Sequence, residues 1–152
     1  MQLTPNFSLA QLIRSDTAER DGINNTPPAE LIPNLRLLAE GLEAVQALLG
    51  APLDISSAYR CEELNRAVGG TGTSQHIEGL AADFTCPGFG SPMDIAAAIR
   101  SSALDFDQCI LEFGRWVHLS VSSEPRKRVL TIYNSRDGYL DGLWDPDGRQ
   151  IA

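Results

Sequence analysis

The sequence predicts an α+β fold in which a mainly antiparallel sheet packs against helices. Two observations lead to this class. Helical periodicity dominates the first half of the chain, and strand-like patterns dominate the second half, with one more helical pattern inserted between them. The 152 residues are 43% hydrophobic and contain no internal repeat, no low-complexity segment and no linker. We therefore expect one domain, residues 1–152, large enough to bury its own core.

The first helical patterns lie near the N-terminus. Residues 7–20 are predicted to form one short helix capped by Ser8. Residues 28–52 contain the longest pattern, in which apolar side chains recur every three or four positions and Pro28 suits the first turn. Gly50 and the proline after it end this helix. Its apolar face predicts core scaffold rather than a functional surface.

The remaining elements alternate between strands and short helices. Two more helices are predicted, over residues 61–70 and 91–102, the second capped by Ser91. Strand patterns occupy residues 53–60, 80–84, 105–113, 115–123 and the start of 128–150. Little more than Gly114 separates two of these strands, which predicts a hairpin at that point. The end of the chain is rich in turn residues.

Charge and composition exclude several function classes. The net charge of −8 argues against nucleic acid and anionic membrane surfaces, because both require a positive footprint. No apolar run approaches the length of a membrane span, and the N-terminus has no pattern typical of a secretory signal. Cys61, Cys86 and Cys109 are odd in number and lack metal-type spacing, so we expect three reduced thiols.

The chain has only two histidines, and both lie beside apolar strand segments. His76 stands in SQHIEGLAADF with Asp83 seven residues later, and His118 stands in RWVHLSV. Two imidazoles and a carboxylate suit a catalytic zinc site, which takes three protein ligands. Gly79 and two alanines between His76 and Asp83 allow close backbone approach. From the residues alone there is an alternative to a metal site, in which His76 is a surface loop residue and His118 is a hydrogen-bonded core residue.

These phrases, together with SSAYR at residues 56–60, resemble the zinc D-alanyl-D-alanine carboxypeptidase family. That family includes peptidoglycan peptidases, vancomycin-resistance dipeptidases and phage endolysins. The resemblance is strong from residue 56 to residue 122 and implies a hedgehog/DD-peptidase-like arrangement. It also implies that His76, Asp83 and His118 bind Zn²⁺.

The resemblance assigns roles to further residues. Arg60 corresponds to an arginine that holds substrate or polarises the scissile carbonyl, as its guanidinium fork suits a carboxylate or an oxyanion. An ion pair with Glu62 or Glu63 is the alternative. Ser74 corresponds to a serine that hydrogen-bonds substrate, with capping of its own loop as the alternative. Trp116 is expected to pack beside the site and shape it.

The general base is where the sequence departs from the family. Relatives commonly have an acid three positions before the last histidine, and Arg115 occupies that position here. Glu112, across the predicted hairpin, is the nearest acid and becomes the expected base, with a solvated hairpin glutamate as the alternative. Glu78 is expected to be a loop carboxylate, with a supporting contact to the metal site as its alternative. Cys86 is expected to be buried rather than a fourth ligand.

The sequence thus predicts a monomeric zinc metallopeptidase that hydrolyses peptide bonds in peptidoglycan stem peptides. Two other classes remain: a catalytically silent zinc-binding domain, and a non-haem iron oxygenase that would use Glu78 as its acid. The neighbouring phrases do not fit the oxygenase. We expect synthesis in the cytoplasm and action on the cell wall after holin-type release, as in a phage endolysin. A bacterial wall-remodelling enzyme is the alternative source, and the choice between terminal and internal cleavage stays open.

Overall fold

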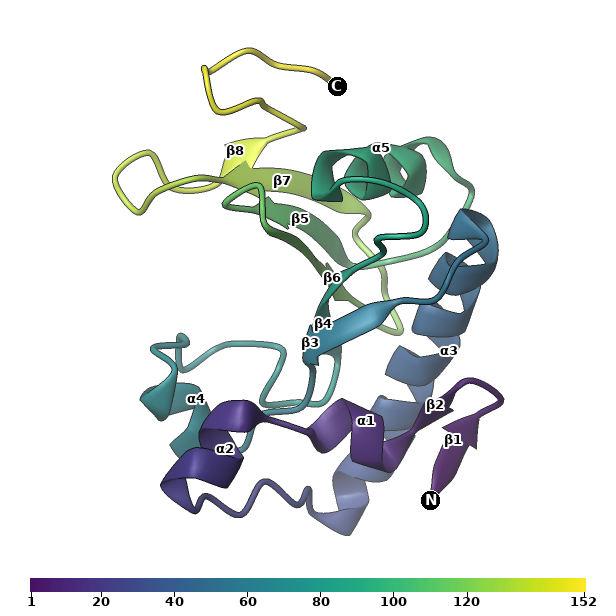
Figure 1. Ribbon diagram of the computed structural model, residues 1–152, viewed down its shortest axis with the longest axis vertical. Helices are drawn as coiled ribbons and strands as arrows, with labels where there is room; N and C mark the ends of the chain where they lie inside the picture. The colour runs from purple at the N-terminus through teal and green to yellow at the C-terminus, as the bar shows by residue number, and fades with distance from the viewer.

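The computed structural model describes residues 1–152 and has a six-stranded sheet at its centre (Figure 1). In spatial order the strands are β3 (Asp54–Ser57), β4 (Ala81–Thr85), β6 (Trp116–Ser120), β5 (Gln108–Glu112), β7 (Arg128–Ile132) and β8 (Leu140–Asp141). Every neighbouring pair is antiparallel except β5 and β7, which are parallel. The predicted α+β class is confirmed, with a sheet that is mixed rather than wholly antiparallel.

The parallel pair arises from the path of the chain after β6. In the connection 121–127, Val121 still bonds to Leu80, but Lys127 donates its backbone N–H to Phe106, just before β5. Arg128 then donates to the carbonyl of Asp107. The connection therefore crosses the end of β5 and places β7 on its far side, running in the same direction.

One face of the sheet is covered by the helices α3 (Ile32–Leu49) and α5 (Pro92–Ser101) (Figure 1). The apolar side chains that recur along residues 28–52 are buried in α3, except Leu31, which precedes the helix and is only partly buried. Alternation along the strands supplies the other side of this core, with fully buried residues from three central strands: Phe84, Leu111, Val117 and Leu119.

The same alternation turns polar side chains to the opposite face. Asp83, His118 and Glu112 each lie one residue from a buried core position on β4, β6 and β5. The hairpin that joins β5 to β6 pairs Glu112 with Trp116 and turns through Phe113 and Gly114, both at positive φ. The predicted hairpin is thereby confirmed, and it brings the candidate base back over the sheet.

The N-terminal segment differs from the prediction. Residues 7–20 form two helices, α1 (Leu9–Ile13) and α2 (Asp16–Asp21), instead of one. Ser8 caps the first, as predicted, but Arg14 is extended and Ser15 caps the second with its own side chain. A small antiparallel pair, β1 (Gln2–Thr4) and β2 (Phe7–Ser8), precedes them and was not predicted.

Two predicted boundaries also shift. The helix expected from residue 28 begins as a 3-10 turn, η1 (Ala29–Leu31), and Pro33 rather than Pro28 occupies the first turn of α3. The strand expected over residues 53–60 ends at Ser57, because the backbone of Tyr59 bonds to Leu12 and leaves the sheet. Helix α4 (Glu62–Ala67) follows as predicted.

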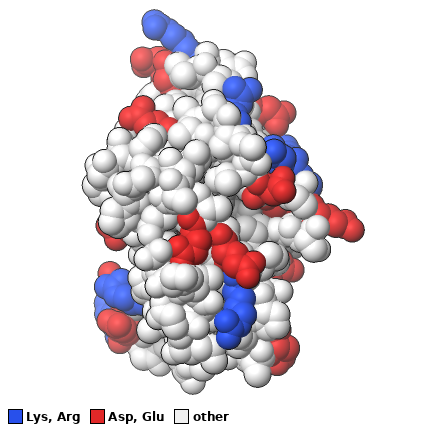
Figure 2. Space-filling view, turned by 90° about the vertical axis from the view of Figure 1, so that its right-hand side faces the viewer, with Lys and Arg blue, Asp and Glu red and all other residues white.

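No helix in the structure is long and apolar enough to cross a membrane. Figure 2 shows the face on which α3 lies, turned toward the viewer. Acidic and basic side chains form small separate groups there, with uncharged surface between them (Figure 2). This face therefore presents no continuous basic patch of the kind that nucleic acid requires.

Candidate metal centre and active site

Asp83 and His118 face each other across neighbouring strands. They are directly paired in the register of β4 and β6, and His118 Nδ1 lies 2.9 Å from Asp83 Oδ1. Directly opposed side chains on one face of a sheet lie within reach of each other. The local fold therefore needs no special loop to join these two groups.

His76 comes to the same point from a turn-rich loop before β4. Its backbone carbonyl accepts from the N–H of Arg60, which ties the loop to the chain leaving β3. The ring is 2% exposed, and its Nδ1 lies 2.6 Å from the carbonyl oxygen of Ala58. Since a carbonyl only accepts, Nδ1 holds the proton and Nε2 keeps its lone pair. That Nε2 lies 3.4 Å from Asp83 Oδ1.

Gly79 permits this loop to close against α3. Its backbone has φ +72°, and a Cβ placed there would meet the Leu35 side chain at 3.1 Å. The small residue that the sequence showed between His76 and Asp83 is thus needed for both conformation and space.

The charges at the centre are set by burial and by each other. Burial lowers the pKa of His76, which keeps the imidazole neutral as a metal ligand requires. Burial alone would raise the pKa of Asp83, but the hydrogen bond with His118 and the nearby His76 imidazole outweigh it and hold that pKa below its usual range. The cluster therefore combines an ionised carboxylate with a neutral ring.

The donor set fits a zinc ion. One ligand atom from each of His76, Asp83 and His118 lies within 4.8 Å of the other two. Ligands about 2.0–2.1 Å from a tetrahedral ion lie about 3.3–3.4 Å apart, close to the spacings seen here. The Ala58 carbonyl supplies the outer contact that orients a metal-binding histidine. Neither Glu78 nor Cys86 belongs to the cluster.

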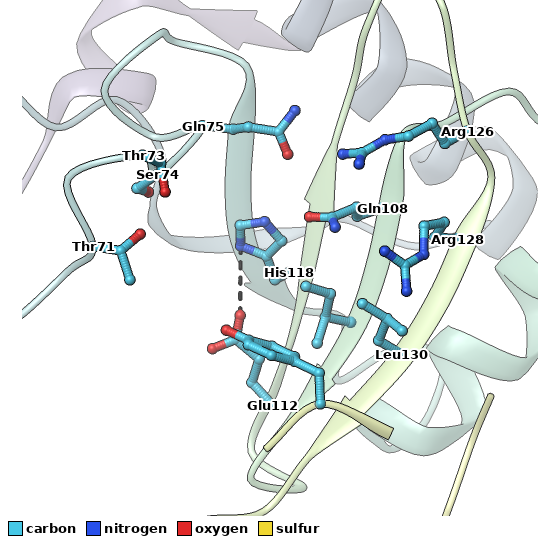
Figure 3. A pocket seen from close by; sticks show the side chains of 12 residues that line it. Thr71, Thr73, Ser74, Gln75, Gln108, Glu112, His118, Arg126, Arg128 and Leu130 are labelled. Atoms are coloured by element: carbon cyan, nitrogen blue, oxygen red, sulfur yellow. Dashed lines mark ion pairs between the residues drawn. The ribbon is translucent and has the colours of Figure 1, made fainter. Parts of the chain in front are cut away.

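Glu112 lies beside this cluster at the end of β5. Its Oε1 is 3.5 Å from His118 Nδ1, as the dashed line in Figure 3 shows. Burial raises the pKa of Glu112, and the negative Asp83 raises it further, while His118 and Arg60 act in the opposite direction. A carboxylate that is 18% exposed and has a raised pKa suits proton transfer near neutral pH. Arg115, by contrast, is exposed on the hairpin turn.

Arg60 lines a cleft that also contains the three candidate ligands and Glu112. It forms no ion pair with Glu62 or Glu63, and its buried Nε has no hydrogen-bond partner. Burial lowers its pKa, which Asp83 and Glu112 counteract. The guanidinium therefore has donors left for a bound ligand, and the alternative ion pair does not form.

Ser74 and Trp116 both line the cleft. Ser74 Oγ accepts from the backbone N–H of His76 at 3.2 Å, so it caps its own loop as well as facing the cavity. Trp116 packs edge to face against Phe113, with ring centroids 5.5 Å apart. Both residues therefore shape the wall of the cleft beside the candidate ligands.

Glu78 and Cys86 lie apart from the cleft. Glu78 is exposed, and its backbone forms hydrogen bonds with Asn34 and Gln75, whereas its carboxylate forms none. Cys86 is fully buried and directs its thiol at backbone carbonyls. The first is therefore a loop carboxylate and the second a buried thiol, as the sequence predicted.

The cleft also contains residues for which the sequence predicted no role. Tyr139 lines it from the segment before β8, and Gln108, Arg126 and Arg128 line its extension along β5 and β7. Alternation along β5 would have placed Gln108 on the face of Glu112. Arg126 and Arg128 could be placed in the cleft only by knowing that β7 pairs in parallel with β5, and no local sequence pattern predicts that pairing.

Comparison with known proteins adds an independent finding. A family model described as Peptidase M15 matches residues 5–120, well over half of the chain. The match includes all three candidate ligands, Arg60 and Glu112, and it ends at the last residue of β6. A comparison with curated proteins found no match.

Proposed function

Because the chain belongs to the peptidase M15 family, the zinc D-alanyl-D-alanine carboxypeptidase type, we propose that it is a zinc-dependent hydrolase of peptide bonds in peptidoglycan stem peptides. The observation that supports this most is the convergence of His76, Asp83 and His118 with Glu112 at their side. A buried metal site alone would not need an acid of raised pKa in the cleft.

The proposed roles follow from the geometry. His76 Nε2, Asp83 Oδ1 and His118 Nδ1 would hold the ion. When bound, zinc lowers the pKa of a coordinated water and polarises the scissile carbonyl. Glu112 accepts the proton of the attacking water on its carboxylate and delivers it to the leaving nitrogen.

Arg60 and the cleft walls hold the substrate. The free donors of Arg60 are proposed to bind the developing oxyanion or a substrate carboxylate. Ser74 and Trp116 are proposed to contact the peptide, since both line the cavity that contains the candidate ligands. The cell wall, reached by holin-type release, stays the predicted place of action, and a monomer the predicted state.

The direct test is mass spectrometry of purified peptidoglycan incubated with the protein, with and without added zinc. We expect new amino termini or released residues only when zinc is present. Intact peptidoglycan under both conditions would contradict the proposal.

The silent zinc-binding domain predicts a different pair of results. Zinc would then raise the melting temperature, because it binds the folded state, but no bond would be cleaved. Measuring both quantities on one preparation separates the two functions. The position of Glu112 beside His118 favours the hydrolase.

A further inference from the structure

The candidate catalytic centre lies in the middle of a cleft rather than at its end. A cavity of about 390 Å³ on one side contains Arg60 and Trp116. A second cavity of about 520 Å³ extends along β5 and β7. The two have lining residues in common: Thr71, Ser74, Glu112, His118 and Tyr139. An extended ligand bound across the centre would therefore be held on both sides of the reacting bond.

The second cavity ends at two arginines. Figure 3 shows Arg126 and Arg128 directed into it, on the side opposite Thr71, Thr73 and Ser74. Arg128 is paired with Gln108 in the parallel register of β5 and β7, and Glu112 lies four residues further along β5. At about 3.3 Å per residue, the two ends of the cavity lie about 13 Å apart along the backbone.

The two arginines keep donors available. Arg126 is held by the buried Asp107, which accepts from Nε at 2.8 Å and from Nη2 at 2.7 Å, so its Nη1 is unused. Arg128 makes one contact, from Nη2 to Asp141 at 3.3 Å, and that carboxylate is 90% exposed. An exposed pair of this kind contributes little and yields readily to a better partner.

We propose that Arg128, with Arg126 beside it, forms a carboxylate-binding subsite for an acidic peptide substrate. This proposal rests on the proposed function and extends it. The side chains of Arg128 and Glu112 each extend several ångströms into the cleft, which shortens the backbone separation of about 13 Å between them. A carboxylate bound to Arg128 therefore lies about two to four peptide residues from the reacting bond.

The position of the subsite distinguishes it from a pocket for the terminal carboxylate. A carboxypeptidase that removes one residue must hold a carboxylate directly next to the reacting bond, about 3.5 Å of chain away. The Arg128 subsite is too distant for that role. It instead selects a stem peptide that carries an acid about two to four residues from the cleaved bond. Both arginines lie beyond the residues matched by the family model.

The test compares two synthetic stem peptides, one with free carboxylates and one with every carboxylate converted to a carboxamide. With zinc-loaded protein we expect the acidic peptide to have the higher kcat/KM. The Arg128→Gln variant should lose about tenfold on the acidic peptide, mainly through KM, and almost nothing on the amide. Arg128→Lys should recover part of the loss, because it restores the charge without the fork.

Arg115→Gln is the matched control, since Arg115 is an exposed arginine on the nearby hairpin turn that lines neither cavity. It should leave the preference for the acidic peptide unchanged. Equal losses on both peptides in Arg128→Gln, a preference that survives that substitution, or no preference in the natural chain would each overturn the subsite.

Binding separates this proposal from the peptidase itself. Calorimetry of both peptides with zinc-loaded Glu112→Gln protein, with and without Arg128→Gln, reports the subsite without turnover. If the natural chain cleaves neither peptide, the proposed function fails. Tighter binding of the acidic peptide that depends on Arg128 would then still support the subsite, and equal affinities would overturn it.

Discussion

Glu112 has the three properties that a general base in this cleft needs. It lies 3.5 Å from a candidate ligand, it is largely buried, and burial together with Asp83 raises its pKa. The hairpin turn explains how an acid six positions before His118 comes to lie beside it. Pairing of Glu112 with Trp116 leaves Glu112 diagonal to His118 on one face of the sheet.

Replacing this acid by its amide tests the role. Glu112→Gln should lower kcat for peptide hydrolysis by about 100- to 10,000-fold, the range that a positioned base contributes. Zinc content should not change, because Glu112 is not among the proposed ligands. Steady-state kinetics with metal analysis measures both quantities.

The control for this variant is Glu78→Gln, which alters an exposed carboxylate in the loop that contains His76. It should retain full activity. If Glu112→Gln and Glu78→Gln lowered kcat by similar factors, Glu112 would contribute only its negative charge and not proton transfer.

Asp107 illustrates what residue patterns do not reveal. It is 2% exposed and accepts from the side chains of Arg126 and Gln75, thereby joining the loop of His76 to the start of β7. Hydrogen bonds from Arg126 and Gln75 lower the pKa of Asp107 to about 2, although burial acts in the opposite direction. The partners lie 19 and 32 residues away, so no local motif marks this carboxylate.

The lowered pKa predicts acid sensitivity. Because the folded-state value is below the unfolded one, Asp107 contributes stability that is complete above about pH 4 and is lost as the pH falls through about 2. The contribution is at most roughly 2 kcal/mol. Urea unfolding of Asp107→Asn from pH 2 to pH 6 should show lower stability at pH 6 and a flatter slope below pH 4.

Asp105→Asn is the control, since Asp105 is an exposed neighbour whose only ion pair is 4.0 Å long. Its pH profile should match that of the natural chain. A profile for Asp107→Asn that also matches would show that the buried contacts do not depend on ionisation.

At the scale of elements, local sequence patterns correctly predicted the helices and turns whose formation depends on residues close in sequence. The apolar repeat of α3 and the Ser91 cap of α5 are of this kind, as is the turn at Gly114. The break at Arg14 was missed, because a second serine starts a new helix where the apolar pattern gives no signal.

The loop before β4 depends on one glycine. Gly79→Ala should lower the free energy of unfolding by about 1–2 kcal/mol, since an alanine at φ +72° is strained and its Cβ presses on Leu35. Zinc affinity should fall with it, because the loop holds His76. Urea unfolding and a zinc titration measure the two effects.

Gly72→Ala tests whether any added methyl in this loop has the same effect. A Cβ at Gly72 would meet no atom within 4 Å, and the backbone there is not left-handed. The substitution should change neither stability nor zinc affinity by much. Equal effects at the two positions would argue that conformation at Gly79 is unimportant.

At the scale of the whole molecule, the antiparallel strands explain why the site was predictable. Asp83 and His118 fall on paired strands, and their residue types and surrounding phrases resembled those of a known family, whose model matches the chain. The cleft beyond them was not predicted. It is built where β7 lies parallel to β5, an arrangement set by a crossing connection and not by residue patterns.

The central claim is that His76, Asp83 and His118 hold a zinc ion that hydrolysis requires. Its most direct test is zinc content and peptidoglycan hydrolysis measured together on the natural chain and on Asp83→Asn, with circular dichroism to check folding. We predict one zinc ion per natural chain, and loss of both zinc and hydrolysis in the folded variant. A natural chain that binds no zinc, or a variant that keeps its zinc and its activity, would contradict the account.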